Sequence, residues 1–135
     1  MSKTAHVPRR IRRPKLYGEL APWFHLVTHP RSYVGEARFA AKSLGLRRGG
    51  KRASVLELGS GGGNNAFHLK KYADLTLTDI SPDMLRQSRR INPTCEHIVG
   101  DMRRLRLGRR FDAVFVHDAV IYMTNERDLA RAIKT

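Results

Sequence analysis

The sequence lacks long hydrophobic runs and has almost no cysteine. No stretch of the 135 residues approaches the length of a membrane span, and no apolar signal-peptide segment lies near the start. Cys95 is the single cysteine, which excludes an internal disulfide and a cysteine-based metal site. We therefore expect a cytoplasmic protein that does not associate with membranes.

Metal-ligand spacings are also missing. The chain has six histidines, but no pair follows a pattern such as H-E-x-x-H. His25 and His29 are four positions apart and could share one helix face, yet no third ligand pattern lies near them. We expect no metal site.

Acidic residues are few, and the charge is strongly positive. There are 26 basic and 12 acidic residues, which gives a net charge of +14, and the start of the chain, MSKTAHVPRRIRRPK, contains no acid. This balance favours anionic partners, nucleic acid above all. A solvated basic tail is the simpler explanation, because no motif that reads DNA or RNA is present and the aromatic residues do not interleave with the basic ones. The sequence permits nucleic acid as a partner but does not favour it.

The chain divides into three predicted parts. Residues 1–15 are expected to form a disordered basic tail, residues 16–52 a helical cap with a linker, and residues 53–135 the core. In the cap, helical spacing of apolar residues predicts a helix before Pro30 and a second helix over about 32–44. The residues at this spacing are Leu20, Trp23, Phe24 and Val27, of which Trp23 and Phe24 are expected to be core rather than substrate contacts.

Strand and helix signals alternate through the core. Short apolar runs predict strands over 54–58, 74–80, 95–100 and 111–119, and helices are predicted over 64–72, 81–91 and 125–133. Ser81 followed by Pro82 is a helix-start signature, and Asn125 is a plausible cap. This order predicts an α/β fold: an open Rossmann-like parallel sheet of about four strands, in the order 3-2-1-4, flanked by helices.

In such a sheet, ligands bind outside the carboxyl ends of the strands. The residues at these ends are Glu57 with the glycine run 59–63, then Asp79, then Asp101 and Met102, then His117 and Asp118. Glycine at the first of these places favours close approach of the backbone to a ligand, because a glycine carries no side chain. We expect one rim, lined largely by carboxylates.

The spacing along this rim fits a nucleoside ligand. Asp79 comes 20 residues after Gly59, where a carboxylate can accept both hydroxyls of a ribose. Asp101 would then lie beside the base, and Met102 could pack on its face. A dinucleotide stays open, since G-G-G-N-N-A from Gly61 matches the looser dinucleotide pattern. Glu57 argues against it, because a carboxylate repels a pyrophosphate and attracts the sulfonium and ammonium of S-adenosylmethionine.

The motifs E-L-G-S-G-G-G, D-I-S-P-D-M-L, G-D-M and F-D-A-V-F-V-H-D-A, in this order, resemble those of class I (Rossmann-like) S-adenosylmethionine-dependent methyltransferases. The segment YGELAPWFHLVTHPRSY resembles the N-terminal cap helices of members that act on small molecules. The resemblance covers about residues 16–134. It implies a small-molecule methyl acceptor, S-adenosylmethionine as cofactor, and cofactor contacts from Tyr33, Glu57, Gly59, Ser60, Gly61, Gly63, Asn64, Asp79, Ile80, Met84, Asp101, Met102 and His117.

Each of these residues also has a purely structural interpretation. The glycines could form only a tight turn, Asp79 could extend the cap of the next helix, and Asp101 could be a solvated turn residue. The methyl group would face His117, Asp118 and Tyr122, which are weak catalytic candidates. The sequence assigns none of them as a base, and it does not say whether oxygen, nitrogen or carbon is methylated.

The resemblance also implies seven strands, whereas four are predicted here, so the chain is expected to be truncated at its C-terminal end. The fourth strand would then be an exposed edge with apolar neighbours (Val114, Val116, Val120 and Ile121), and the chain would be poorly stable or self-associate there.

Three other functions stay open. They are a non-catalytic cofactor-binding fragment that needs a partner, a nucleic-acid methyltransferase, although H-D-A-V replaces its usual [DNS]-P-P-[YFW] motif, and an NAD-dependent dehydrogenase.

Overall fold

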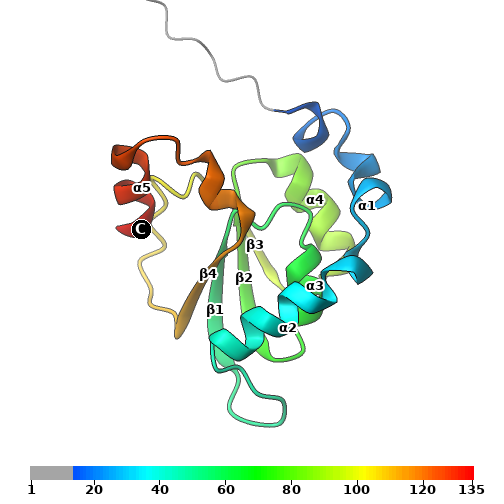
Figure 1. The fold of residues 1–135 in the computed structure, drawn as a ribbon, viewed down its shortest axis with the longest axis vertical. Helices are drawn as coiled ribbons and strands as arrows, with labels where there is room; N and C mark the ends of the chain where they lie inside the picture. The colour runs from blue at the N-terminus through cyan, green and yellow to red at the C-terminus, as the bar shows by residue number, and fades with distance from the viewer. Residues whose placement is uncertain (1–13) are drawn as a thin grey trace, which may run out of the picture.

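A computed structural model describes residues 14–135, so the predicted tail lies outside the described residues except for its last two positions. Figure 1 shows a central sheet with helices beside it. The strands are β1 (Ala53–Leu58), β2 (Ala73–Asp79), β3 (Glu96–Val99) and β4 (Ala113–Val116). The α-helices are α1 (Phe24–Val27), α2 (Val34–Ser43), α3 (Asn64–Leu69), α4 (Pro82–Ile91) and α5 (Glu126–Ile133). The 3-10 helices are η1 (Lys15–Tyr17), η2 (Ala21–Trp23), η3 (Pro30–Tyr33) and η4 (Asp118–Tyr122).

The four strands are parallel and lie in the order β3-β2-β1-β4, which confirms the predicted fold class. Glu57 of β1 is aligned with Leu77 of β2 and with Phe115 of β4. All strands therefore end at the same edge of the sheet, as the sequence requires for a common rim. The last strand is shorter than expected, because the chain after Val116 turns into η4 rather than continuing to residue 119.

One face of the sheet carries the main core. Alanines 37, 40 and 41 of α2 pack with Val55, Leu69 and Leu77 in one buried cluster. Small side chains on α2 let this helix lie close to its neighbours, and the buried apolar area drives the packing. Helix α4 covers the same face farther along, where Ser88 hydrogen-bonds to His97 of β3.

The other face of β2 is covered too, and this changes the burial pattern that the sequence indicated. The alternation DLTLTDI suggests one wet and one dry face, yet Leu75 through Thr78 are all buried. Thr76 donates to Glu96 and accepts from Arg109, a residue of the segment between β3 and β4. The hydroxyl of Thr76 is thus hydrogen-bonded inside the fold. A threonine in this strand therefore does not indicate a solvent-exposed position.

The predicted helix pattern of the cap is wrong in detail. Proline at the start of η2 and of η3 fixes the backbone locally, and the segment breaks into single turns instead of one amphipathic helix. Phe24 is buried, as expected, but Trp23 is 60% exposed and therefore not part of the core. The second helix forms close to its expected place, as α2.

Two helix starts behave as the sequence predicts. The Ser81 hydroxyl accepts a hydrogen bond from the backbone N–H of Met84, and Asn125 accepts one from Asp128. A side chain that accepts these N–H groups satisfies donors that the first turn leaves unpaired. The Ser81 hydroxyl also donates to the carbonyl of Tyr17, so the start of α4 holds the N-terminal segment.

The glycines after β1 are needed first of all for packing within the chain. A Cβ on Gly59 would lie 2.2 Å from that of Ala119, and one on Gly62 would lie 2.4 Å from the Phe24 ring. Gly63 has φ +78° and caps α3, and a Cβ there would lie 2.2 Å from the Ser88 hydroxyl oxygen. In contrast, a Cβ on Gly61 would only touch Met84, at 3.6 Å. The run therefore serves a tight turn against three elements, and Gly61 is its most open member.

We expect Gly63→Ala to lower the free energy of unfolding by about 2–5 kcal/mol, because a left-handed backbone and an overpacked contact are combined at this position. Gly45→Ala is the matched control. It has a similar φ of +66° with nothing within 4 Å of the added methyl group, so only the backbone cost of about 1–2 kcal/mol should remain. Urea unfolding of both variants measures the difference. Equal losses of unfolding free energy would show that α4 can move to accommodate the added methyl group at position 63.

Candidate functional site

The carboxylate of Asp79 joins the two loops that follow β1 and β2. Its two oxygens each accept a backbone N–H at 2.8 Å, one from Gly61 and one from Ser81. The loop after β1 is tied to β2 a second time, because Ser60 N–H donates to the carbonyl of Thr78. Asp79 thus lies at the junction of both loops, where the sequence placed it.

Glu57 is a buried carboxyl group without a hydrogen-bond partner at one oxygen. Its side chain is 3% exposed, and Oε2 has no partner among residues 14–135. Burial raises the pKa of Glu57 to about 8, and the negative charge of Asp79 adds to the shift. An ionised carboxylate here is costly in the free protein and would be stabilised by a cation bound beside it.

Three further buried polar atoms in the same stretch lack a partner within residues 14–135. They are the Ser60 hydroxyl and the Oδ1 atoms of Asn64 and Asn65. The Nδ2 group of Asn64 does have a partner, since it donates to the carbonyl of Thr28 in the cap. Native structures leave few buried polar groups unsatisfied, so four between β1 and the first turn of α3 are typical of a ligand site.

The methionines predicted to contact a cofactor lie on opposite sides of the glycine run. Met84 is 1% exposed and packs with Ala21 and Phe24 in a small second core. Met102 lies against Gly59, where its methyl carbon is 3.0 Å from the place of a Cβ. Ile80 is 42% exposed beside Asp79. Met102 and Ile80 therefore offer apolar surface at the rim, whereas Met84 supports the loop from inside.

Asp101 is held by an arginine that the sequence analysis did not single out. Arg103 binds both carboxylate oxygens of Asp101, at 2.6–3.1 Å, and also reaches Asp128 of α5 at 3.0 Å. Hydrogen bonds from Arg103 lower the pKa of Asp101. The two carboxylates and the guanidinium fix the loop after β3 to α5. Only the short spacing D-M-R hints at this pair in the sequence.

His117 lies between two carboxylates. Its Nε2 is 3.1 Å from Glu36 of α2, and its Nδ1 is 3.4 Å from Asp118. The side chain of Asp118 is 80% exposed, whereas that of His117 is 30% exposed. Glu36 was not predicted as a site residue, because α2 is remote in sequence from β4. The structure brings both to the same edge of the sheet.

Two tyrosines connect the N-terminal segment with the loop after β4. The hydroxyls of Tyr17 and Tyr122 are 3.0 Å apart, and their rings meet edge to face at 6.3 Å. The hydrogen bond with Tyr122 raises the pKa of Tyr17 to about 12, together with burial and the charges of Asp79 and Asp118. Tyr122 was a predicted site residue. Tyr17, which was not, is its partner over the same rim.

The cap lies directly against the glycine run. His25 Nε2 is 2.9 Å from the carbonyl oxygen of Gly62, and His68 Nε2 is 2.8 Å from that of Pro30. Tyr33 ends η3 and is half-buried. The cap thus adds a wall to the rim, as expected of a segment that covers a ligand.

Two surface depressions, of about 390 and 430 Å³, lie elsewhere, at the amino ends of the strands. The surface depressions therefore lie at one end of the sheet, whereas the unpartnered polar side chains lie at the other. We assign the candidate site by chemistry, because the unpartnered groups and Asp79 are at the carboxyl ends. Over residues 14–135 no three His, Cys, Asp or Glu side chains converge as a metal site would require, and no helix is long and apolar enough to cross a membrane.

Comparison with known proteins identifies the class of protein. A family described as a methyltransferase domain matches residues 55–135, the stretch that contains β1 to α5. The match covers more than half of the chain, so the chain belongs to this family. The predicted class, a Rossmann-like S-adenosylmethionine-dependent methyltransferase, is thereby confirmed.

Two curated relatives are sugar-modifying enzymes. The dTDP-3-amino-3,4,6-trideoxy-alpha-D-glucopyranose N,N-dimethyltransferase of Streptomyces venezuelae is 32% identical over 105 residues, which are 76% of this chain and 44% of the relative. The dTDP-3-amino-3,6-dideoxy-alpha-D-glucopyranose N,N-dimethyltransferase of Streptomyces fradiae is 33% identical over 121 residues, 87% of this chain and 47% of the relative. The chain thus spans about half the length of the curated relatives it matches.

Solved structures agree with the fold. Streptomyces venezuelae DesVI superposes with a TM-score of 0.68 at 29% identity, over 87% of this chain and 50% of that one. CalS10, an amino pentose methyltransferase from Micromonospora echinaspora solved with S-adenosylmethionine bound, has a TM-score of 0.71 at 25% identity, over 82% of this chain and 48% of that one. Both likenesses agree with the fold, and the CalS10 structure contains the cofactor that the sequence predicts.

We expect Glu57→Gln to stabilise the free protein, and more so as the pH rises. Between pH 4.5 and about 8 the unfolded chain releases the Glu57 proton while the folded chain keeps it, so the unfolding free energy of the parent protein falls with pH. Glu57→Gln has no carboxyl proton to release, so its unfolding free energy does not fall with pH in this way. Its gain should be below about 1 kcal/mol near pH 5 and on the order of 4 kcal/mol near pH 8.

Denaturant unfolding at both pH values measures this gain. Glu126→Gln, the same change on exposed α5, is the control and should show no such growth with pH. A Glu57→Gln variant that is equally or less stable than the parent near pH 8 would mean that the carboxylate is solvated or paired in solution.

Proposed function

We propose that this chain binds S-adenosylmethionine at the carboxyl ends of β1 and β2. The observation that carries the proposal is Glu57, a buried carboxyl group with a raised pKa and an oxygen without a partner among the described residues. A ligand with an ammonium and a sulfonium would stabilise the ionised form of this group, whereas a pyrophosphate would be repelled by that form. NAD is therefore disfavoured.

The other predicted contacts are part of the same proposal. Asp79 would accept the ribose hydroxyls, and Asp101, Ile80 and Met102 would surround the adenine. The backbone from Gly59 to Gly63, with Ser60 and Asn64, would line the amino-acid part. Tyr33, Met84 and His117 complete the proposed set, with Met84 acting through the loop that it supports. Support comes from the burial and the unpartnered atoms described above.

The proposed reaction is methylation of an amino group on a small molecule. The curated relatives suggest a nucleotide-linked amino sugar as the acceptor class, and this chain covers only about half of their length. When bound, the cofactor supplies an electrophilic methyl group. The residues of this chain would orient both reactants, an effect that can contribute about 7 kcal/mol or more. In this proposal His117 would accept the proton that the amine loses, and Glu36 and Asp118 beside its two ring nitrogens would stabilise the resulting cation.

The partner of this chain is also proposed rather than known. The chain spans about half the length of its curated relatives, and a non-catalytic cofactor-binding fragment that works with a partner stays the alternative function. The exposed valines of β4, Val114 and Val116, offer an edge for such a contact or for a second copy. The tail, the cap with its linker and a cytoplasmic location stay predictions of the sequence, and nucleic-acid methylation gains no support from the site.

Calorimetric titration with S-adenosylhomocysteine tests the proposal, with NAD as the control ligand. We expect micromolar binding of the former, at least about tenfold weaker for Asp79→Asn, since two loops and the ribose lose a charged acceptor. Asp83→Asn is the matched control, because Asp83 is close in sequence but pairs with Arg86 on the surface. Its affinity should equal that of the parent.

The same titration reports on Glu57. A cation bound beside this group lowers its pKa, so binding near pH 7 should release protons, and the measured heat should depend on the ionisation enthalpy of the buffer. Glu57→Gln should bind without this dependence. A folded parent chain that binds neither ligand, or binding with no proton release, would refute the assignment of Glu57.

A further inference from the structure

Positive charge is in excess at the end of the sheet where the strands begin. Six acidic side chains lie where the strands end, Glu36, Glu57, Asp79, Asp83, Asp101 and Asp118, whereas three, Asp74, Glu96 and Asp112, lie where the strands begin. Basic side chains gather where the strands begin, because the loops before β1, β2 and β4 are rich in them: Arg47, Arg48, Lys51, Arg52, Lys70, Lys71, Arg109 and Arg110. Parallel strands place all these loops at one end. The eight basic side chains outnumber the three acidic ones at this end, so it carries a local excess of positive charge.

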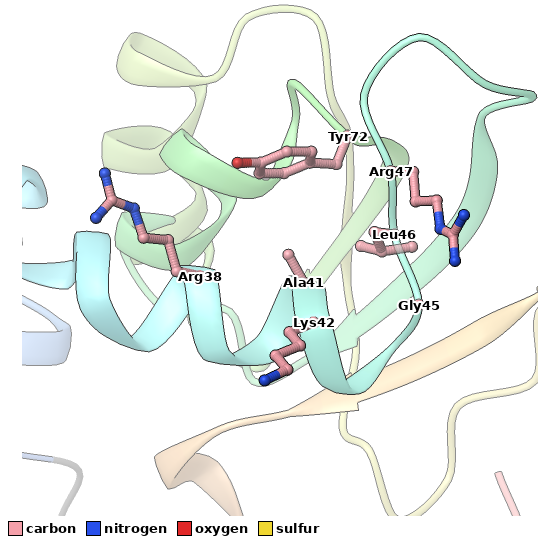
Figure 2. A pocket seen from close by; sticks show the side chains of 7 residues that line it. All are labelled: Arg38, Ala41, Lys42, Gly45, Leu46, Arg47 and Tyr72. Atoms are coloured by element: carbon pink, nitrogen blue, oxygen red, sulfur yellow. The ribbon is translucent and has the colours of Figure 1, made fainter.

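A depression of about 390 Å³ opens at this basic end, between the last turns of α2 and the start of β2. Its lining is Arg38, Ala41, Lys42, Gly45, Leu46, Arg47 and Tyr72, without an acidic residue. In Figure 2, Arg38, Tyr72 and Arg47 follow one another across the depression, with Lys42 below. Tyr72 is half-buried, and the ammonium of Lys71 lies 5.1 Å from its ring centre.

The cations of this depression have no acidic partner. Within residues 14–135, Arg38, Lys42 and Arg47 form no ion pair. The neighbouring depression differs, because Arg52 there is paired with Asp74 and Arg109 with Glu96. Three unpaired cations around one hollow repel each other, and an anion bound between them would relieve this repulsion.

We propose that this basic end is a docking surface for the phosphodiester backbone of a nucleic acid, bound away from the methyl-transfer site. The basic residues continue past the hollow into the 47–52 loop and into Lys70 and Lys71 before β2, so they fit an extended polyanion better than a single phosphate. Arginine forks match phosphate oxygens, and a tyrosine ring beside them offers a surface for a base. The bound nucleic acid is not the methyl acceptor, because the candidate site lies at the opposite, acidic end.

Fluorescence anisotropy with a labelled oligothymidylate of roughly 20 nucleotides tests this surface, since single-strand sites usually span fewer. Arg38→Ala with Lys42→Ala removes two cations from α2. We expect binding about tenfold weaker at low salt, and a log-affinity slope against log salt that is shallower by about 1.4, or 0.7 for each lost phosphate contact. Neither residue belongs to the candidate site, so binding of S-adenosylhomocysteine should not change.

Arg127→Ala with Lys134→Ala is the matched control. It removes the same two kinds of side chain from exposed positions, one in α5 and one directly after it, at the other side of the molecule, and leaves the same net charge. This variant should bind like the parent. Thermal melting of both variants verifies that each is folded, and alanine on an exposed helix face should not destabilise either.

Three outcomes would overturn the proposal. Equal weakening by both double variants would mean that net charge alone attracts the oligonucleotide. Displacement by inorganic phosphate at a concentration equal to that of the bound strand's nucleotides would assign the hollow to a single phosphate. Equally tight binding of poly-glutamate, with the same loss in Arg38→Ala/Lys42→Ala, would assign the surface to an acidic protein.

Discussion

The hydrogen bonds of Asp79 hold the candidate site together. One carboxylate fixes the loop after β1 and the start of α4 at once, through Gly61 and Ser81. Ser81 in turn caps α4 and holds the carbonyl of Tyr17, so the N-terminal segment depends on the same junction. A charged acceptor can do this because hydrogen bonds to an ionised group are about twice as strong as those between neutral groups.

The same charge makes its surroundings unfavourable for a second carboxylate. Glu57 lies in the interior near Asp79, and the two effects, burial and repulsion, act on it in the same direction. Nothing in packing requires an acid at this point of β1, where neighbouring positions are leucines. Natural proteins bury an acidic side chain without a full set of partners mostly at functional sites, where a loss of stability is tolerated for the sake of binding.

The elements that local chemistry determines were predictable from sequence. The sheet order follows from the alternation of strands and helices, and the caps Ser81 and Asn125 follow from short-range hydrogen bonds. The family also followed from motifs in a fixed order. In the cap, periodicity failed because Pro22 acts on the backbone more strongly than apolar spacing does. In β2, the alternation predicted the strand but not the long-range partners that bury its threonines.

Within the site, sequence placed residues better than it assigned their contacts. Asp79, Asp101 and His117 lie at strand ends because parallel strands end together. Their present partners could not be read from spacing, since Glu36 is remote along the chain and Arg103 competes for a carboxylate that was expected to face a base. The glycines show the same limit. Three of them are required by Ala119, Phe24 and Ser88, and a pattern of letters does not distinguish such packing from room for a ligand.

The excess of positive charge where the strands begin makes the two ends of the sheet electrically different. A polyanion attracts this end and repels the end where the strands close on Asp79. A polyanion therefore orients the molecule as well as attracting it. The end where the strands begin faces the polyanion, and the acidic rim faces the solution. A small cationic solute near that polyanion would meet the open rim first, so the two ends of one sheet would favour different molecules by orientation alone.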